Sequence, residues 1–379
     1  MIALARKTLV YEWRRFLPAI FAIGFSGVLL TVQAALVLGI FGSAAVYVTG
    51  SSADLWAGYP GTQSVNFGRP VSDDVEMRLR MDPDVTAVEP YLWVEGDWHD
   101  AGSAGGGVSV YVSGIDVRSD GMMFSRLISS GLRQRLREPG ALIIDRADLD
   151  QLGVGLGGAA WINGRPVHVV ATVSGLRALG GVNVLASLDT ARDLNVGDST
   201  TTGGYTYFVA RVSDPAKATV VQARLKPEPA FGPFEVWTAD EFASRSQLYW
   251  MFDTGAGVAV LFMAGIVCLV GAVITSQSLM AMVVASAREY ATLNALGASL
   301  AALSRVVIEQ ACWVGGLGLI VAAVVSAMLL SLAASRDVPV AMNPSAALIC
   351  AALVAVLALV SGLIAVRGLL RADPAMLLR

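Results

Sequence analysis

Four long stretches of the chain are apolar and nearly free of charge, and shorter mixed stretches separate them. They cover residues 16–48, 254–285, 306–334 and 344–366. A helix of about 20 apolar residues crosses the hydrocarbon core of a bilayer, so each stretch can form one span. The first far exceeds the apolar core of a cleavable signal peptide, which reaches about 15 residues. The pattern predicts an integral membrane protein with four spanning helices.

Basic residues near the ends of these stretches predict the orientation of the chain. Lys and Arg gather before the first span, between the second and third, and after the fourth. Because cytoplasmic loops are enriched in these residues, both termini are expected on the cytoplasmic side. The predicted transmembrane helices 1 to 4 are 16–48, 251–285, 306–334 and 344–366. The predicted cytoplasmic parts are the N-terminus 1–15, the segment 286–305 and the C-terminus 367–379. The predicted outer parts are the extracytoplasmic domain 49–250 and the short loop 335–343.

The long segment 49–250 has the pattern of a mixed α/β domain. Runs rich in β-branched and aromatic residues predict strands at 85–94, 108–115, 141–144, 160–173, 205–212 and 234–238. Helical spacing predicts helices at 71–81, 124–137, 216–225 and 239–251, and the last of these is expected to lead straight into the second span. The fold class is therefore four transmembrane α-helices plus a large mixed α/β extracytoplasmic domain inserted between helices 1 and 2.

The composition supports a membrane protein but says little about its substrate or its binding partners. Apolar residues make up 55% of the chain, charged residues 15%, and the mean hydropathy is +0.62. The net charge of −3 conceals an acidic excess within 49–250, so it says little about partners, and nothing indicates nucleic-acid binding. The three cysteines all fall inside predicted spans, so no disulfide is expected in the outer domain.

Some residues fit short motifs of cofactor or metal sites, but the neighbouring sequence lacks the elements or ligands that such sites need. Gly153, Gly155 and Gly158 fit G-x-G-x-x-G, but a strand-like run follows them, whereas a dinucleotide site needs a helix there. His99 and His168 have no ligand spacing, so no metal site is expected. No catalytic residue, cofactor site or metal site is predicted, and the chain is not expected to be an enzyme.

The segment 288–299, REYATLNALGAS, has a pattern that a simple loop between spans does not need. Apolar and polar residues alternate along it, and it closes at Gly297, where a helix C-cap is expected. We interpret it as a short helix on the membrane surface that contacts a second protein; an ordinary turn is the alternative. Glu309, one turn into the third span, is interpreted as an ion-pair partner of Arg305 four residues before it, or as a carboxylate that reaches the membrane interface. The functional alternative is a polar contact that couples this helix to Arg305 or to segment 288–299.

The arrangement of these segments resembles the MacB/FtsX-type ABC transporter permeases. That family has one span, a large outer domain, three further spans and a cytoplasmic segment before the third. AREYATLNALGAS resembles the family's signature after the second span, and the closing RADPAMLLR, with Asp373, Pro374 and Ala375, resembles its C-terminal motif. The wording EYATLNALG is most similar to the DevC-like branch. The outer domain matches only in size and mixed α/β character.

The resemblance implies a permease subunit in the bacterial cytoplasmic (inner) membrane that couples to a separate ABC ATPase, where ATP and Mg²⁺ would bind. It implies mechanotransmission along long helical stalks, a second permease chain as a homo- or heterodimer, and a lipid-, glycolipid- or peptide-like substrate. In the DevC-like branch a periplasmic adaptor and an outer-membrane channel would complete the exporter. The residues that would contact the ATPase are Arg288, Glu289, Tyr290, Leu293, Leu296 and Gly297.

Two other functions fit the same segments. An FtsX-like regulator would activate an extracytoplasmic cell-wall hydrolase without moving cargo. A haem or hydrophobic small-molecule extruder would share the architecture, although no dedicated ligand residue is recognised beyond Glu309. The substrate cannot be read from the chain.

Overall fold

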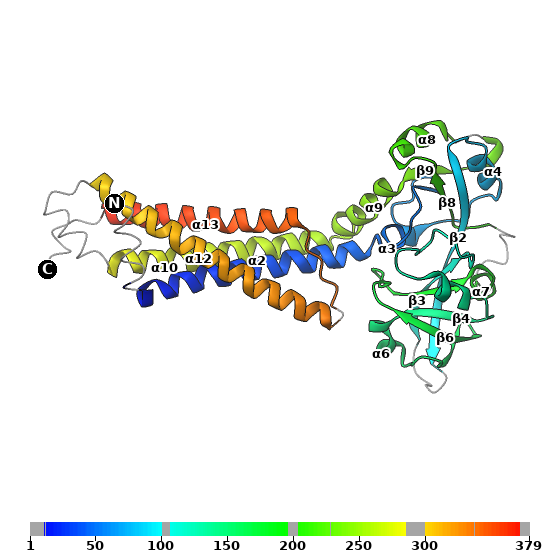
Figure 1. The fold of residues 1–379 in the computed structure, drawn as a ribbon, viewed down its shortest axis with the longest axis horizontal. Coiled ribbons are helices and arrows are strands. Elements are labelled where there is room, and N and C mark those ends of the chain that lie inside the picture. The colour runs from blue at the N-terminus through cyan, green and yellow to red at the C-terminus, as the bar shows by residue number, and fades with distance from the viewer. Residues whose placement is uncertain are drawn as a thin grey trace. The chain divides into compact units, whose positions relative to one another are not determined.

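The chain forms two compact units, which are described here separately. The computed structural model describes residues 11, 13–100, 107–195, 204–227, 229–285, 300–336 and 338–371 (Figure 1). One unit joins Met1–Gly39 to Val258–Arg379, and the other is Ile40–Gly257. We call the first the membrane unit and the second the outer unit.

Four helices in the described part of the chain are long and apolar enough to cross a membrane, as predicted. They are α2 (Trp13–Ser43), α10 (Ala256–Ala285), α12 (Leu300–Ser335) and α13 (Pro344–Arg371), coloured from blue to red in Figure 1. Few of their residues are charged, so a lipid environment can accept most of their surface.

Small residues allow α2 and α12 to approach closely within the membrane unit. A Cβ atom added at Gly27 would lie 2.6 Å from the Ala322 Cβ, and one at Gly318 would lie 2.7 Å from the Ile23 Cγ2. The Gln33 amide of α2 donates to the Val260 carbonyl of α10 at 3.4 Å. Close backbone approach and hydrogen bonds between helices are the usual substitutes for the hydrophobic effect inside a bilayer.

Part of the outer unit is a closed β-barrel, with six strands among the described residues. The strands follow the order β2 (Val85–Asp100), β3 (Val108–Ile115), β7 (Val182–Ser187), β4 (Ala141–Asp145), β6 (Arg165–Val173) and β5 (Ala159–Ile162), which pairs with β2 again. Its interior is filled by side chains such as Val94, Trp98 and Val184. Closure removes the free strand edges of this lobe.

The other part of the outer unit is a sheet that continues from the same long strand. β2 pairs with β8 (Tyr207–Val212), which pairs with β1 (Leu55–Gly58), and β1 pairs with β9 (Glu235–Thr238). α4 (Asp74–Arg80) and α8 (Ala218–Arg224) cover one face of this sheet through an apolar cluster. Residues 85–91 of β2 pair with a strand of the sheet, and residues 92–100 pair with strands of the barrel, so one strand joins the two lobes.

A further apolar cluster contains residues of both lobes. Ile143 and Leu185 come from the barrel, whereas Trp56, Tyr207 and Trp237 come from the sheet. Tyr47 of α3 (Val46–Thr49) and Phe242 of α9 (Ala239–Leu248) belong to the same cluster. α3 and α9, which lie near the two ends of the outer unit in the sequence, therefore pack into its central core.

Several predicted elements are confirmed, and others are corrected. The strand 108–115 is β3, and α4 and α8 lie within the predicted helices 71–81 and 216–225. The predicted strand 160–173 is a hairpin, because Asn163 and Gly164 both have positive φ, of 49° and 76°, as a tight two-residue turn requires. The elements β1, β7 and α7 (Leu188–Leu194) were not predicted.

The predicted helix 124–137 is wrong over its first half. Only α5 (Ser130–Arg135) is helical, and Phe124 has a φ of 54°. The amphipathic spacing of residues 124–132 comes from a loop whose backbone groups bond to distant parts of the chain.

The predicted continuous helix from 239 into the second span is also wrong. α9 ends at Leu248, a π-helix named η5 (Tyr249–Asp253) follows, and Gly255 has a φ of 74° before α10 begins. A left-handed residue ends a regular helix, so a joint separates α9 from α10.

Candidate functional site

The residues predicted to contact an ATPase lie outside the described part of the chain. Arg288, Glu289, Tyr290, Leu293, Leu296 and Gly297 all fall in 286–299, and the C-terminal motif 372–379 does so too. Arg305 and Glu309 both belong to α12, where Glu309 is half-buried. Their ion pair stays a prediction, as does the coupling role of the segment.

The structure shows a hydrogen-bonded region around the end of α3, near the start of the outer unit. We call it the α3 junction, and it consists of residues 47–54 and the loop 121–128. Backbone bonds join the two segments: the Ser52 amide donates to the Met122 carbonyl, and the Arg126 amide donates to the Gly50 carbonyl, both at 3.0 Å. The Phe124 amide donates to the Ser51 Oγ at 3.0 Å, which accounts for the left-handed Phe124 backbone.

A buried ion pair fixes the other side of this loop to β2. The Glu89 carboxylate accepts from the amides of Met122 and Met123 and lies 3.9 Å from an Arg133 guanidinium nitrogen. Arg133 in turn donates to the carbonyl oxygens of Asp116 and Met123. Both side chains are about 2% exposed or less, so the pair ties the loop to β2 without contact with solvent.

Burial shapes the protonation of both partners. It raises the pKa of the Glu89 carboxyl above its ordinary value, and the Met122 amide and Arg133 oppose that rise. It lowers the pKa of the Arg133 guanidinium, which nearby Glu89 and Asp116 oppose. Each group therefore needs its partner to stay charged, because an unpaired buried charge has a high free-energy cost.

α9 packs beside α3 and begins with a regular cap. The Thr238 Oγ1 accepts from the Glu241 amide at 3.2 Å, as an N-cap should. The Phe242 ring stacks on the Trp237 ring at a centroid distance of 4.7 Å, and it also contacts Trp56. The Ala239 amide donates to the Asp54 carbonyl at 2.9 Å, which joins the start of α9 to the α3 junction.

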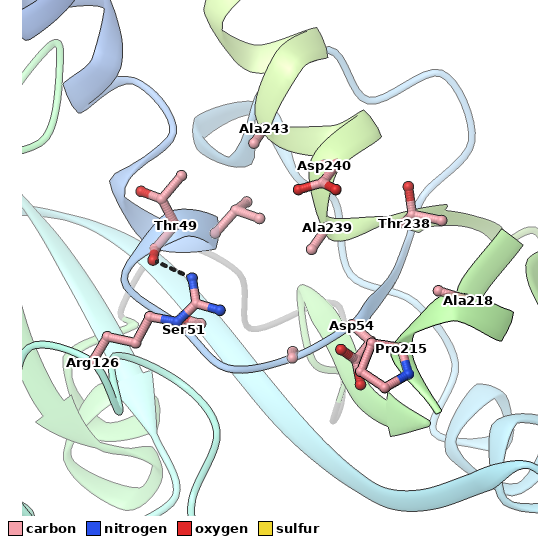
Figure 2. A pocket seen from close by; sticks show the side chains of 12 residues that line it. Thr49, Ser51, Asp54, Arg126, Pro215, Ala218, Thr238, Ala239, Asp240 and Ala243 are labelled. Carbon is pink, nitrogen blue, oxygen red and sulfur yellow. Dashed lines mark hydrogen bonds between the residues drawn. The ribbon is translucent and has the colours of Figure 1, made fainter. Parts of the chain in front are cut away.

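A cleft of about 260 Å³ lies between α3, α9 and α8. Figure 2 shows Thr49 and Ser51 on one side of it and Thr238, Ala239 and Asp240 on the other. The Arg126 guanidinium donates to the Thr49 carbonyl at 3.1 Å and borders the cleft. The carboxyl groups of Asp54 and Asp240 also line it.

The glycines and histidines discussed in the sequence analysis can be placed in the fold. Gly153 and Gly158 flank the turn before strand β5, so the G-x-G-x-x-G pattern has no nucleotide-binding context. His99 contacts Asp97 and His168 contacts Glu138, in each case with the histidine side chain partly exposed. No cluster of three metal-ligating side chains occurs in the described ranges.

Comparison with known proteins found a family match within the membrane unit. The FtsX-like permease C-terminal domain matches residues 261–374, which include α12, α13 and most of α10. Residues 261–374 are thus similar to an FtsX-like permease domain. This match supports the expected resemblance to MacB/FtsX-type ABC permeases. No finding distinguishes the DevC-like branch.

Solved structures similar to the chain cover about half of it. The periplasmic region of MacB from Actinobacillus actinomycetemcomitans is 14% identical, with a TM-score of 0.35, over 51% of this chain and 92% of that one. The extracellular domain of the noncanonic ABC-type transporter YknZ from Gram-positive bacteria is 13% identical, with a TM-score of 0.34, over 49% and 100%. A search of curated proteins found no match.

The α3 junction was missed by sequence reasoning, although one signal pointed to it. Glu89 interrupts the largely apolar run 85–94, whereas Arg133 lies in a polar stretch, 129–135, whose other residues are mostly exposed. A charged residue within an apolar run usually has a buried partner of opposite charge. The sequence alone does not identify that partner, because the two residues are 44 positions apart along the chain.

Proposed function

We propose that the chain is the permease subunit of an ABC exporter that transmits motion across the membrane. A separate ATPase would bind segment 288–299, and ATP-driven closure would shift the first two spanning helices. The outer unit would change shape in response and drive export or extraction of an amphipathic molecule. The FtsX-like match supports the permease class. The packing of α3 and α9 into one core supports the mechanical part of the proposal.

The α3 junction supplies a path for that motion inside the outer unit. α3 follows α2 after only two residues, and its continuation is bonded to loop 121–128. Glu89 and Arg133 bond the same loop to β2, the strand that both lobes share. A displacement of α3 would therefore act at the boundary between barrel and sheet.

The break after α9 changes the form of the proposed stalk. The π-helix and Gly255 interrupt the chain between α9 and α10, so force from the second span would pass through a joint. α2 has no comparable left-handed residue, although a turn at residues 44 and 45 separates it from α3. We propose that the first span transmits the larger share of the force to the outer unit.

The cargo and partners are proposed from the family alone. A glycolipid- or lipid-like molecule or a peptide would be the cargo, and a second permease chain would complete a homo- or heterodimer. A periplasmic adaptor and an outer-membrane channel would follow if the chain belongs to the DevC-like branch. The expected site is the bacterial inner membrane, with both chain termini in the cytoplasm.

Purification of the tagged chain from its native membranes in mild detergent tests the proposal. Recovery of an ABC ATPase together with an adaptor would support the exporter. An ATPase with a cell-wall hydrolase and no adaptor would instead support an FtsX-like regulator, and specific haem binding to the purified dimer would support a haem extruder. Absence of any ATPase, with no stimulated hydrolysis after reconstitution, would contradict all three.

A further inference from the structure

An exposed apolar patch of the outer unit lies next to the start of the second span. We call it the juxtamembrane patch, and it consists of Phe67, Leu248 and Phe252. Their exposed fractions are 48%, 54% and 48%. Leu248 and Phe252 are one helical turn apart, and the Phe67 ring lies 5.2 Å from the Tyr249 ring between them in sequence. Large apolar side chains grouped in this way mark an interaction surface.

The patch is held in place from both lobes of the outer unit. Trp250 stacks on Phe67 at a centroid distance of 6.1 Å, and its indole N–H donates to the Ser64 Oγ at 3.2 Å. A Cβ atom added at Gly180, which precedes barrel strand β7, would lie 3.4 Å from the Trp250 ring. The contacts of Trp250 therefore hold the residues that carry the exposed side chains against the rest of the outer unit.

The position of the patch in the chain identifies what covers it. Phe252 is four residues from Ala256, where the candidate span begins. Four residues reach at most about 14 Å even when fully extended, so Phe252 lies near the level where the bilayer starts. Tyr and Trp side chains are enriched at this level, and Tyr249 and Trp250 lie between Leu248 and Phe252 in the sequence. Exposed apolar residues elsewhere in the outer unit, such as Met81 at the C-cap of α4, have no such connection.

We infer that the juxtamembrane patch binds the lipid surface of the outer leaflet. Phe67, Leu248 and Phe252 would enter the headgroup region, and the outer unit would be anchored to the membrane beside the second span. The joint at Gly255 would let the anchored segment keep its orientation when α10 moves. This inference does not depend on the proposed export function.

Fluorescence quenching in lipid nanodiscs tests the inference on the full chain. Cys268, Cys312 and Cys350 are first replaced by alanine, and a single cysteine is introduced by Leu248→Cys and labelled with bimane. Lipids that carry a nitroxide near the headgroup should remove most of its emission, whereas aqueous iodide should remove little. The matched control is Met81→Cys, an exposed apolar position at the C-cap of α4, where the reverse is expected.

Two outcomes would overturn the inference. Equal quenching of both labels by iodide would place the patch in water. Quenching of the Leu248→Cys label by neither reagent would show that protein covers it, either a second copy of the chain or a partner. A second label, introduced by Phe252→Cys, repeats the measurement should the first variant fail to fold.

Discussion

At the residue scale, Glu89 and Arg133 form a buried ion pair in the outer unit. They share one buried site, and the Glu89 carboxylate also accepts from two loop amides. Removing one member of a buried pair typically costs about 3–5 kcal/mol, because the other charge is left unpaired. The pair is thus a sensitive test of how the loop is fixed.

Glu89→Leu is expected to lower the free energy of unfolding of the outer unit by about 3–5 kcal/mol. The double variant Glu89→Leu with Arg133→Leu should lose less than the sum of the single variants, because it leaves no uncompensated charge. Denaturant unfolding followed by tryptophan fluorescence measures all three. Strict additivity would show that the two side chains do not interact.

The raised pKa of Glu89 predicts a pH dependence with a definite sign. Between the ordinary value of 4.5 and the raised value, the folded state binds more protons than the unfolded state. Unfolding then releases protons, so the contribution of Glu89 to stability falls as pH rises through that window. Glu89→Gln should flatten this part of the stability profile. An unchanged slope in that variant would contradict the shift.

Leu293→Asp tests the predicted contact with the ATPase at the same scale. A carboxylate placed in an apolar contact should abolish stimulated ATP hydrolysis while the chain still inserts into the membrane. Thr292→Asp adds the same charge at a polar position of the segment and should retain most of the activity. Hydrolysis by the reconstituted ATPase is the measurement, and equal activity of the two variants would remove the coupling role.

At the element scale, the contact of α2 with α12 depends on glycines. Gly27→Ala would place its methyl group 2.6 Å from the Ala322 methyl group, so the helices would have to separate. Overpacking of this kind costs about 1–3 kcal/mol. Gly316→Ala in α12 meets no atom within 4 Å and is the control. Thermal unfolding in detergent should show a lower Tm for Gly27→Ala only; equal Tm values would contradict close packing.

The accuracy of the sequence predictions differed between elements for a physical reason. The spans were predictable because crossing a bilayer imposes a length and a composition on one continuous segment. Residues 124–128 were mistaken for the start of a helix because their apolar spacing is local, whereas the bonds that set the backbone of loop 121–128 run to Ser51 and Glu89. The break at Gly255 was missed because the polar α9 and the apolar α10 both have helical patterns and no proline separates them.

At the scale of the whole molecule, the chain passes into and out of the outer unit through neighbouring elements. α3 and α9 share one core through Tyr47 and Phe242, and they border the cleft in Figure 2. This neighbourhood could not be derived from the sequence, since α3 and α9 are separated by nearly the whole outer unit. If the outer unit changes shape under load, the two elements are expected to shift against each other at the cleft.

Restraining that shift is the most direct test of mechanotransmission. Thr49→Cys and Asp240→Cys place exposed thiols on opposite sides of the cleft, in a chain whose native cysteines are replaced by alanine. A short reducible cross-linker should suppress ATP hydrolysis by the assembled complex, because the ATPase cycle would be blocked through the permease, and reduction should restore it. The Thr49→Cys variant treated with the same reagent controls for modification alone. Full hydrolysis in the cross-linked protein would mean that α3 and α9 move as one body, and the motion of the outer unit would then have to arise elsewhere.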